Sequence, residues 1–376
     1  MKSLVIAPRF PWPAYTGDRL RASIWIEALR GSGEVALIAP RGTIPADARM
    51  QFYAARPSLR RTIGGAMTLL RERLPLQCLP AARYDWPAAI ANARLEMGPF
   101  DVTIVLLSRM HPWVRASLQG RTILDAIDSL GRSAAERRKA ASPLLRWIWT
   151  IEERRMVRLE RGLAQNYGEV IVVSDDETAE FGGATAVTIG VPARPLDDGA
   201  RGYDFGFWGR LAYFANADAA AWLLREIWPA IRALRPAATL IIGGADAPRA
   251  LRNDARRGGV TLLSPVGDMA AFARHIRVAL MPLRYGSGQA TKVLEAAEAG
   301  CAIVGSPTAL RGLGALAPHA CVESAASGFA RAAVDLLTDA DARARMSARL
   351  RETIATHYDR ANALARLSAI AATGTR

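Results

Sequence analysis

Short apolar runs alternate with helix-like stretches along the first half of this chain. Between the first two runs, the segment from Arg19 to Leu29 repeats apolar side chains every three or four residues, which predicts a helix. Buried strands that alternate with helices are typical of a parallel sheet covered on both faces, so we predict a Rossmann-like α/β domain. The predicted strands are Leu4–Ala7, Val35–Ile38, Val102–Leu107, Thr122–Asp125 and Val170–Val173.

The same alternation restarts in the second half. Residues 193–202 are rich in Pro, Gly and Asp and show no periodicity, so we take them as a linker. A helix is predicted from about Ala217 to Leu234, with a break or kink near Pro229. This half therefore predicts a second doubly wound α/β domain. Its predicted strands are Phe205–Trp208, Thr239–Ile242, Val260–Leu263, Val278–Met281 and Ile303–Val304.

The length of 376 residues fits two domains of roughly 100–200 residues each. We divide the chain into a first domain at 1–192, a second at 203–355, and a C-terminal helix at 356–376 that could pack back on the first domain.

The chain is strongly basic, with 49 Lys and Arg against 35 Asp and Glu and a formal net charge of +14. Such a charge favours nucleic acid, an anionic membrane surface or an anionic small molecule as partner. No basic block, zinc-binding spacing or aromatic-rich RNA-binding motif is present, so we expect no nucleic-acid partner. The segments 59–73 and 143–158 combine basic and apolar residues. Such helices either lie on anionic lipid or are partly buried with solvated basic faces.

The three cysteines, Cys78, Cys301 and Cys321, are far apart and form no Cys-x-x-Cys pair, which favours a reducing compartment. The first apolar run is short and meets Pro8 and Arg9, unlike a signal peptide. No apolar stretch reaches the roughly 18 residues that a membrane span needs. We expect a cytoplasmic protein that could touch the inner face of the plasma membrane.

Lys292 is one of only three lysines in a chain dominated by arginine. It lies in Gly286-Ser-Gly-Gln-Ala-Thr-Lys292, a loop of small residues that runs into a predicted helix. Such a loop exposes backbone amides at a positive helix end, which suits a phosphate, and the lysine adds a compact charge. The alternative is an ordinary solvated helix lysine.

Several other small or basic residues follow predicted strands of the second half. Gly209 and Arg210, Gly243, and Gly267 come directly after or near strand ends, as does the loop that precedes Lys292. Ligands of doubly wound sheets bind outside the carboxyl ends of the strands. We therefore expect these positions to face one crevice. For Arg210, the alternative is a surface arginine.

This arrangement resembles the GT-B glycosyltransferases, whose two Rossmann-like domains face a central cleft, over almost the whole chain. The closer resemblance is to the retaining group 1 enzymes (family four), and in particular to bacterial exopolysaccharide-type transferases. Its most specific part is the block from Pro282 to Val304, Pro-Leu-Arg-Tyr-Gly-Ser-Gly…Lys…Glu…Gly-Cys-Ala-Ile-Val. Supporting parts are Pro11–Arg19, Gly209–Leu211, Asn216–Pro229, Gly243–Gly244 and Ser306–Leu313.

The resemblance implies a sugar transferase with a nucleotide-diphosphate sugar as donor and a glycan or lipid-linked glycan as acceptor. It also implies retention of the anomeric configuration. Because we find no convincing metal motif, we expect no cofactor and no metal, with fixed cations neutralising the departing diphosphate. Asp339-Ala-Asp341 looks like a paired-carboxylate metal motif, but a helix N-cap is the better interpretation. The implied catalytic residues are His111, Arg210 and Lys292; the implied donor-binding residues are Gly17, Arg19, Gly209, Gly243, Gly267, Gly286, Ser287, Gly288 and Glu295.

The chain departs from the family pattern at two positions. The family has two glutamates with seven residues between them. In the family the first lies against the donor sugar and the second binds the ribose hydroxyls. Glu295 matches the second glutamate, but Ser287 stands in place of the first. Asn216 stands near where many relatives have a lysine. Ser287 leaves open a catalytically silent scaffold, and the fold also suits a nucleotide-sugar epimerase. His111 could be a loop histidine positioned by Pro112, and Asp125 and Asp128 favour strand-end caps.

Overall fold

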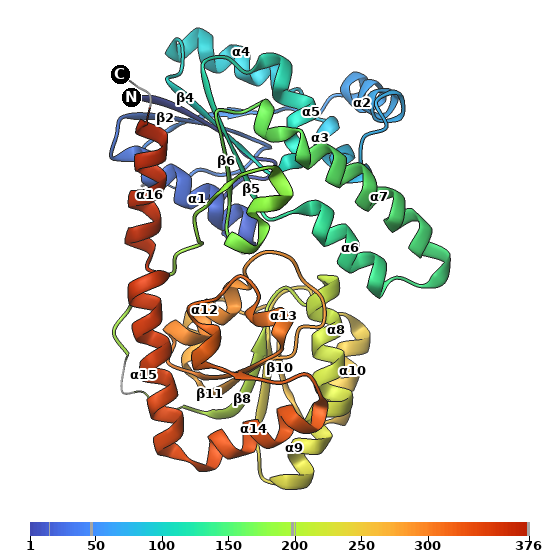
Figure 1. The fold of residues 1–376 in the computed structure, drawn as a ribbon, viewed down its shortest axis with the longest axis vertical. Helices are drawn as coiled ribbons and strands as arrows, with labels where there is room; N and C mark the ends of the chain where they lie inside the picture. Colours follow the sequence, from blue (N-terminus) through green and yellow to red (C-terminus); the bar gives the residue numbers. More distant parts are fainter. Residues whose placement is uncertain (15, 46–47, 197–198, 200, 374–376) are drawn as a thin grey trace. The chain divides into compact units, whose positions relative to one another are not determined.

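The computed structural model describes residues 1–376 except 15, 46–47, 197–198, 200 and 374–376. By its internal contacts the chain divides into two compact units, which we describe separately (Figure 1). Unit 1 comprises Met1–Thr188 with Ala363–Arg376, and unit 2 comprises Ile189–Asn362. The division therefore falls ahead of the stretch 193–202 that we took as a linker.

Unit 1 is built on a seven-stranded sheet in the order β3-β2-β1-β4-β5-β6-β7, with every neighbouring pair parallel. All five predicted strands are confirmed, with bounds that shift by at most two residues. Two edge strands escaped prediction because they are short and lack an apolar run. The strands are β1 (Lys2–Ile6), β2 (Glu34–Ala39), β3 (Gln51–Ala54), β4 (Val102–Leu106), β5 (Arg121–Ile127), β6 (Glu169–Val172) and β7 (Thr185–Ala186).

Helices cover this sheet, and the C-terminal helix contributes to unit 1. Arg121 of β5 donates to the carbonyl oxygens of Ile370 and Ala371 at 2.6 and 2.8 Å, which fastens the last turns of that helix to the sheet. The helices are α1 (Gly17–Arg30), α2 (Leu59–Arg71), α3 (Leu79–Ala82), α4 (Trp86–Met97), α5 (His111–Val114), α6 (Leu130–Ala140), α7 (Pro143–Arg161) and α16 (Arg360–Ala372), which starts in unit 2.

A buried ion pair joins α1 to β5. Arg21 Nε donates to Asp125 Oδ2 at 2.6 Å, and both side chains are fully buried. Trp25 Nε1 donates to the same oxygen at 2.6 Å, while Oδ1 accepts from the amide of Ile127 at 3.0 Å. Asp125 thus caps its strand end, as the sequence indicated, and also anchors α1.

Unit 2 contains a six-stranded parallel sheet in the order β10-β9-β8-β11-β12-β13. All five predicted strands are confirmed, and the two-residue edge strand β13 was not predicted. The chain winds outward from β8 to one edge and then crosses to β11, so the direction of winding reverses between β8 and β11. The strands are β8 (Tyr203–Trp208), β9 (Leu240–Gly243), β10 (Thr261–Leu263), β11 (Ile276–Met281), β12 (Ala302–Gly305) and β13 (Cys321–Val322).

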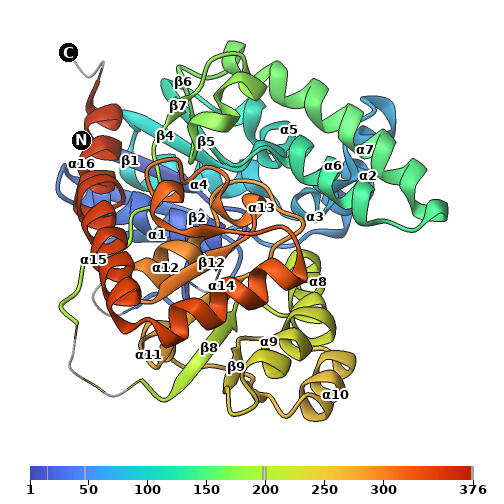
Figure 2. The ribbon, with the colours of Figure 1, turned by 60° about the horizontal axis from the view of Figure 1, so that its bottom comes forward.

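The predicted break near Pro229 is a π-helical turn at Leu223–Ile227, which ends α8 and precedes α9. Asp339 is the N-cap of α15 and accepts from the amide of Ala342 at 2.8 Å, so its carboxylate acts as a cap. In Figure 2, α12 and α15 lie against each other beside β12. The helices are α8 (Phe214–Trp222), α9 (Trp228–Leu234), α10 (Arg249–Arg257), α11 (Met269–Arg274), α12 (Thr291–Glu298), α13 (Pro307–Leu310), α14 (Ala326–Thr338) and α15 (Ala340–His357).

Candidate functional site

In the candidate site of unit 2, the backbone at Gly209, after β8, passes very close to the backbone at Gly244, after β9. We call this close approach the glycine crossing. Gly209 and Gly244 both have positive φ, +145° and +147°. A Cβ on Gly244 would lie 1.7 Å from the carbonyl oxygen of Gly209, and one on Gly209 would lie 3.0 Å from Lys292 Nζ. Only glycine allows so close an approach. The crossing therefore brings the lysine directly against the backbone at the end of β8.

Lys292, the second residue of α12, is held from two sides. Its ammonium donates to Asn216 Oδ1 and lies 4.8 Å from the ring centroid of Phe207. Asn216 Nδ2 in turn donates to the carbonyl oxygen of Arg210 at 2.9 Å. Asn216, which the sequence analysis marked as a departure from the family but gave no contact, therefore connects the lysine to the loop after β8.

Burial lowers the pKa of Lys292 to about 7, although the nearby Glu295 carboxylate opposes this shift. A lysine in this state gains its charge fully when an anion comes close. A strongly shifted pKa beside a strand end is typical of a functional group. Lys292 is thus not the ordinary solvated lysine of the alternative interpretation.

Glu295 lies one turn further along α12, and Trp208 fixes its carboxylate. Trp208 Nε1 donates to Glu295 Oε2 at 2.8 Å. Burial raises the pKa of Glu295, while the Trp208 hydrogen bond and the Lys292 charge lower it. Sequence reasoning missed the role of Trp208, although its place immediately before Gly209 was an available signal.

Arg210 leaves the end of β8 towards the loop after β9. Its Nε lies 2.9 Å from Asp246 Oδ2, and both side chains are about half exposed, at 50% and 54%. An exposed pair of this kind contributes little to stability, so an anion can compete with Asp246 for the guanidinium. The geometry is consistent with the predicted role, which stays a prediction.

The loop before α12 is held by side chains from within unit 2. Gln289 donates to the carbonyl oxygen of Gly312 at 2.9 Å and accepts from the amide of Ile189 at 3.1 Å. The carbonyl oxygen of Gly286 accepts from Arg311 at 3.2 Å, and Gly288 has φ +66°. These contacts fix the path that carries Ser287 to the start of the helix.

The first turn of α12 has the properties of an anion-binding end. Its N-cap, Ala290, provides no side-chain hydrogen bond to the helix. The first amides of a helix need such partners from side chains, water or a ligand, and they lie at the positive end of the helix dipole. The N-terminus of α12 and the Lys292 ammonium thus belong to one short stretch of chain.

Two predicted glycines have other surroundings. A Cβ on Gly243 would lie 2.4 Å from the Phe272 ring, so packing in the core explains this glycine. Gly267 has open space around it, and Asp268 beside it caps α11 through the amides of Ala270 and Ala271. A surface hollow of unit 2, lined in part by Asp268, contains none of the predicted site residues.

The predicted residues of unit 1 lie near the carboxyl ends of its strands. Gly17 is the first residue of α1, and Arg19 donates to the carbonyl oxygen of Pro13 at 3.4 Å. His111 begins α5 but is only 5% exposed, with Nδ1 3.2 Å from Tyr167 Oη. Desolvation lowers the pKa of His111 to about 4, so its ring is neutral at pH 7. Its catalytic role stays a prediction.

Sequence reasoning missed a charged group where β1 and β4 end. Asp18 accepts two hydrogen bonds from Arg9, both at 2.7 Å, and one from Thr16 at 2.7 Å. Arg109 follows β4; desolvation lowers its pKa, while the charges of Asp18 and Asp128 raise it. Arg109 therefore belongs electrostatically to this group.

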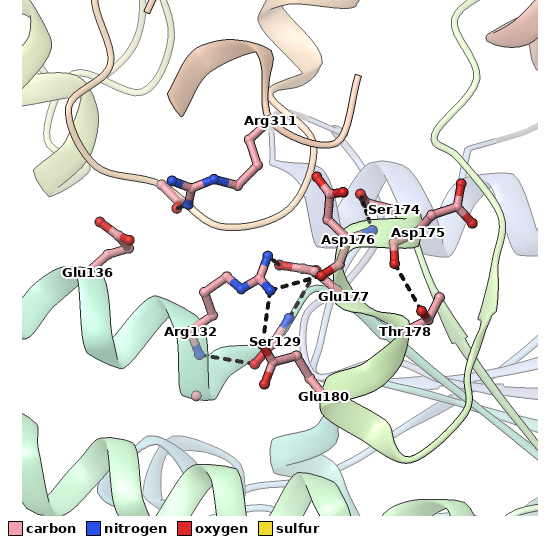
Figure 3. A network of polar contacts seen from close by, with 12 residues as sticks. Ser129, Arg132, Glu136, Ser174, Asp175, Asp176, Glu177, Thr178, Glu180 and Arg311 are labelled. Carbon is pink, nitrogen blue, oxygen red and sulfur yellow. Dashed lines mark hydrogen bonds and ion pairs between the residues drawn. The ribbon is translucent and has the colours of Figure 1, made fainter. Parts of the chain in front are cut away.

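A second polar network of unit 1 orders the loop after β6 (Figure 3). Arg132 of α6 donates to the Glu180 carboxylate and to the carbonyl oxygen of Asp176, both at 2.9 Å. Glu177 accepts from the amide of Ser129 at 3.2 Å. These groups satisfy one another, so we assign them a structural role. Among the described residues, no cluster of three His, Cys, Asp or Glu could hold a metal ion.

Comparison with known proteins gives a family match for the part of the chain that carries these residues. Residues 202–339, which carry the whole site of unit 2, match the family model described as Glycosyl transferases group 1. No protein of curated function matches the chain.

Solved structures with the same fold cover nearly the whole chain. Sucrose-phosphate synthase from Thermosynechococcus elongatus is 15% identical over 98% of both chains, with a TM-score of 0.75. WaaG, a glycosyltransferase involved in lipopolysaccharide biosynthesis, is 15% identical over 100% of both, with a TM-score of 0.68. Anabaena HepE in complex with UDP and glucose is 12% identical over 98% and 99%, with a TM-score of 0.69. The predicted fold, two Rossmann-like domains of GT-B type, is confirmed.

Proposed function

We propose that this protein is a retaining glycosyltransferase that moves a sugar from a nucleotide-diphosphate sugar to a glycan or lipid-linked glycan. The observation that carries the proposal is the placement of Lys292 and Glu295. One turn of α12 presents an ammonium against the glycine crossing and a carboxylate fixed by Trp208. The match of residues 202–339 to group 1 glycosyltransferases supports it.

In this proposal the diphosphate of the donor lies against the start of α12. Negative charge grows on the diphosphate as the bond from the anomeric carbon to its oxygen breaks. Lys292, Arg210 and the first amides of α12 neutralise that charge, and one such contact contributes on the order of 10²–10³ in rate. Glu295 accepts hydrogen bonds from the ribose hydroxyls. No metal takes part, because the two cations and the helix end supply the positive charge.

Retention follows if the acceptor hydroxyl attacks from the face that the diphosphate leaves. The departing phosphate oxygen then takes the hydroxyl proton, the new C–O bond forms, and the nucleoside diphosphate is released with that proton. Ser287 contacts the donor sugar through its hydroxyl or backbone. His111, whose ring is neutral at pH 7, keeps its predicted catalytic role.

We further propose that the protein acts in bacterial polysaccharide synthesis, in the cytoplasm, on an acceptor held at the inner face of the membrane. Among the described residues, no helix is long and apolar enough to cross a membrane. The WaaG likeness supports a lipid-linked glycan as the class of acceptor, since that protein is involved in lipopolysaccharide biosynthesis.

The test is donor turnover by the full-length protein. We expect it to release nucleoside diphosphate from at least one of UDP-glucose, UDP-N-acetylglucosamine, GDP-mannose or ADP-glucose, with EDTA present. We expect release to fall by a factor on the order of 10²–10³ in Lys292→Ala, with circular dichroism unchanged. NMR of the glycosylated product should show the donor's anomeric configuration.

The rival functions give different results in the same assay. A silent scaffold would bind nucleotide without turnover of any donor. An epimerase would interconvert donor sugars without releasing nucleotide. Inhibition by EDTA that added Mg²⁺ or Mn²⁺ restores would contradict the metal-independent mechanism.

A further inference from the structure

Exposed apolar side chains gather on one part of unit 1. Sixteen large apolar residues are exposed in the described parts of the chain. Ten of them lie in the segment that runs from α2 to the start of α3, or on the first half of α7. Exposed apolar side chains that cluster in this way, rather than singly, often mark a site for a protein or membrane partner. The ten are Leu59, Ile63, Met67, Leu70, Leu76, Leu79, Leu144, Leu145, Trp147 and Ile151.

Helix α2 presents four of these side chains as one stripe, which we call the α2 stripe. Leu59, Ile63, Met67 and Leu70 are 76%, 56%, 66% and 75% exposed. Their spacing of four, four and three residues places them on the same face of the helix. The stripe is therefore a continuous apolar surface rather than four scattered residues.

The other face of α2 is already used. Gly65 and Leu69 are buried, and a Cβ on Gly65 would lie 2.5 Å from Ala82 Cβ of α3. The helix thus packs on unit 1 through one side and leaves the α2 stripe outside. Its first turn is capped by Ser58, which accepts from the amide of Arg61.

Cations lie beside the α2 stripe. Arg60 and Arg71 lie on α2 directly after Leu59 and Leu70, and Arg73 comes just after the helix. All three arginines are exposed. Within the part of the chain that the structure describes, Arg60, Arg73 and Arg146 of α7 have no ion-pair partner. Apolar side chains beside unpaired arginines match an anionic lipid surface, where headgroups lie above acyl chains.

The first half of α7 adds a second apolar face. Leu144, Trp147 and Ile151 are 83%, 62% and 40% exposed and follow a helical repeat of three and four residues. Tryptophan is favoured at a membrane interface because its ring is apolar and its N–H is polar.

Helix α7 is fastened to the segment that follows α2 (Figure 1). The buried Glu152 carboxylate accepts from the amides of Leu76 and Gln77 at 2.7 and 2.8 Å. Arg155 donates to the carbonyl oxygen of Leu74 at 3.2 Å. The two apolar faces therefore belong to one part of unit 1 and can act together.

We propose that α2 and the first half of α7 dock unit 1 on an anionic lipid bilayer, with the α2 stripe among the acyl chains and the arginines at the headgroups. A second copy of this chain is a poorer occupant, because its own arginines would face those beside the stripe. The purpose of docking rests on the proposed function, since it brings unit 1 to a lipid-linked acceptor.

The test is co-sedimentation of the full-length protein with vesicles. We expect binding to vesicles of equal parts phosphatidylglycerol and phosphatidylcholine, and little to phosphatidylcholine alone. The double variant Ile63→Ser/Met67→Ser should lower the partition coefficient at least about tenfold, because both side chains lose their burial in the acyl chains. Arg60→Ala/Arg71→Ala should lower it several-fold and weaken its salt dependence.

Matched variants control for loss of apolar area and of charge elsewhere. Leu95→Ser removes a leucine of α4 that is even more exposed, at 83%, and Arg331→Ala removes an exposed arginine from α14. Both should bind vesicles like the wild type. Wild-type protein that stays in the supernatant, or equal loss in Leu95→Ser and Ile63→Ser/Met67→Ser, would overturn the proposal. A dimer that dissociates in the stripe variant, without vesicle binding, would assign the stripe to a second copy.

The same samples separate this inference from the proposed function. UDP or GDP binding by the stripe variant should equal that of the wild type. A protein that binds vesicles but turns over no donor would contradict the transferase, not the docking. A protein that turns over a donor but does not bind anionic vesicles would contradict the docking, not the transferase.

Discussion

At the scale of single residues, unit 2 holds two ionisable groups in an environment that disfavours their charge. Burial lowers the pKa of Lys292 to about 7 and raises that of Glu295. Burial therefore costs each group part of the stability of its charged form in the free protein, and a polar or charged ligand can offset that cost. In the proposed function a nucleotide provides a partner for each group, with its diphosphate at the ammonium and its ribose hydroxyls at the carboxylate.

The role of Glu295 predicts a selective loss of affinity. Glu295→Gln should weaken binding of the preferred nucleoside diphosphate about tenfold or more, because a hydrogen bond to a charged group contributes about 1.5–3 kcal/mol. Binding of inorganic pyrophosphate, which has no ribose, should change less, since only the influence of the Glu295 charge on Lys292 is lost. Trp208→Phe removes the donor to Glu295 Oε2 and should give a smaller loss with the same selectivity. Calorimetry with both ligands checks this; equal losses for the two would contradict the ribose contact.

Part of the candidate site in unit 2 could be predicted from the sequence, and part is visible only in the structure. The loop from Gly286 and the position of Glu295 on the next helix could be predicted because those residues are close in sequence. The roles of Trp208 and Asn216 were missed, because each acts on α12 through a side chain from a distant element, and only the position of Trp208 before Gly209 offered a signal. The burial of His111 was missed for the same reason, since its contact, Tyr167, comes from another part of unit 1.

At the scale of elements, the glycine crossing fixes how the ends of β8 and β9 meet. The amide of Gly209 donates to Gly243 at 3.1 Å, and the amide of Leu211 donates to Ala245 at 2.8 Å. The two loops thus run together beyond the strands, and Lys292 contacts them from α12. Their separation leaves no room for a side chain at Gly244.

Gly244→Ala should therefore lower the free energy of unfolding by at least about 2 kcal/mol, through a forced positive φ and a clash with backbone. Gly267→Ala is the matched control, because its Cβ would meet nothing within 4 Å; we expect a change within about 0.5 kcal/mol. Urea unfolding followed by circular dichroism measures both. Equal stability of the two variants would contradict the close crossing.

Which strands could be predicted depended on their burial. The central strands of both sheets are almost completely buried and contain apolar runs such as Leu4–Ile6, Ile104–Leu106 and Val278–Met281, which stand out in the sequence. β3 has exposed ends, and β7 and β13 have two residues each, so none of the three forms an apolar run. These edge strands form because they pair with a neighbouring strand, and that pairing cannot be read from their own sequence.

At the scale of the whole molecule, each unit has its own parallel sheet and its own buried core. The residues that we propose to bind the diphosphate lie in unit 2, and most of the exposed large apolar side chains lie in unit 1. Net charge could be read from composition, but its use depends on placement: Lys292 is held within unit 2, whereas Arg60 and Arg73 are exposed. Composition alone could not separate these two uses of positive charge.

The most direct test of this account is calorimetric titration of the full-length protein with UDP, GDP and ADP at several pH values. We predict that one of them binds, and that its affinity falls above pH 7 by up to tenfold per pH unit. The sign follows because free Lys292, with a pKa of about 7, must take up a proton to bind the diphosphate. Lys292→Met should bind weakly and without this pH dependence, while Lys139→Met, on α6 of unit 1, should behave like the wild type. Binding of none of the three nucleotides, or equal affinity in Lys292→Met and wild type, would contradict the account.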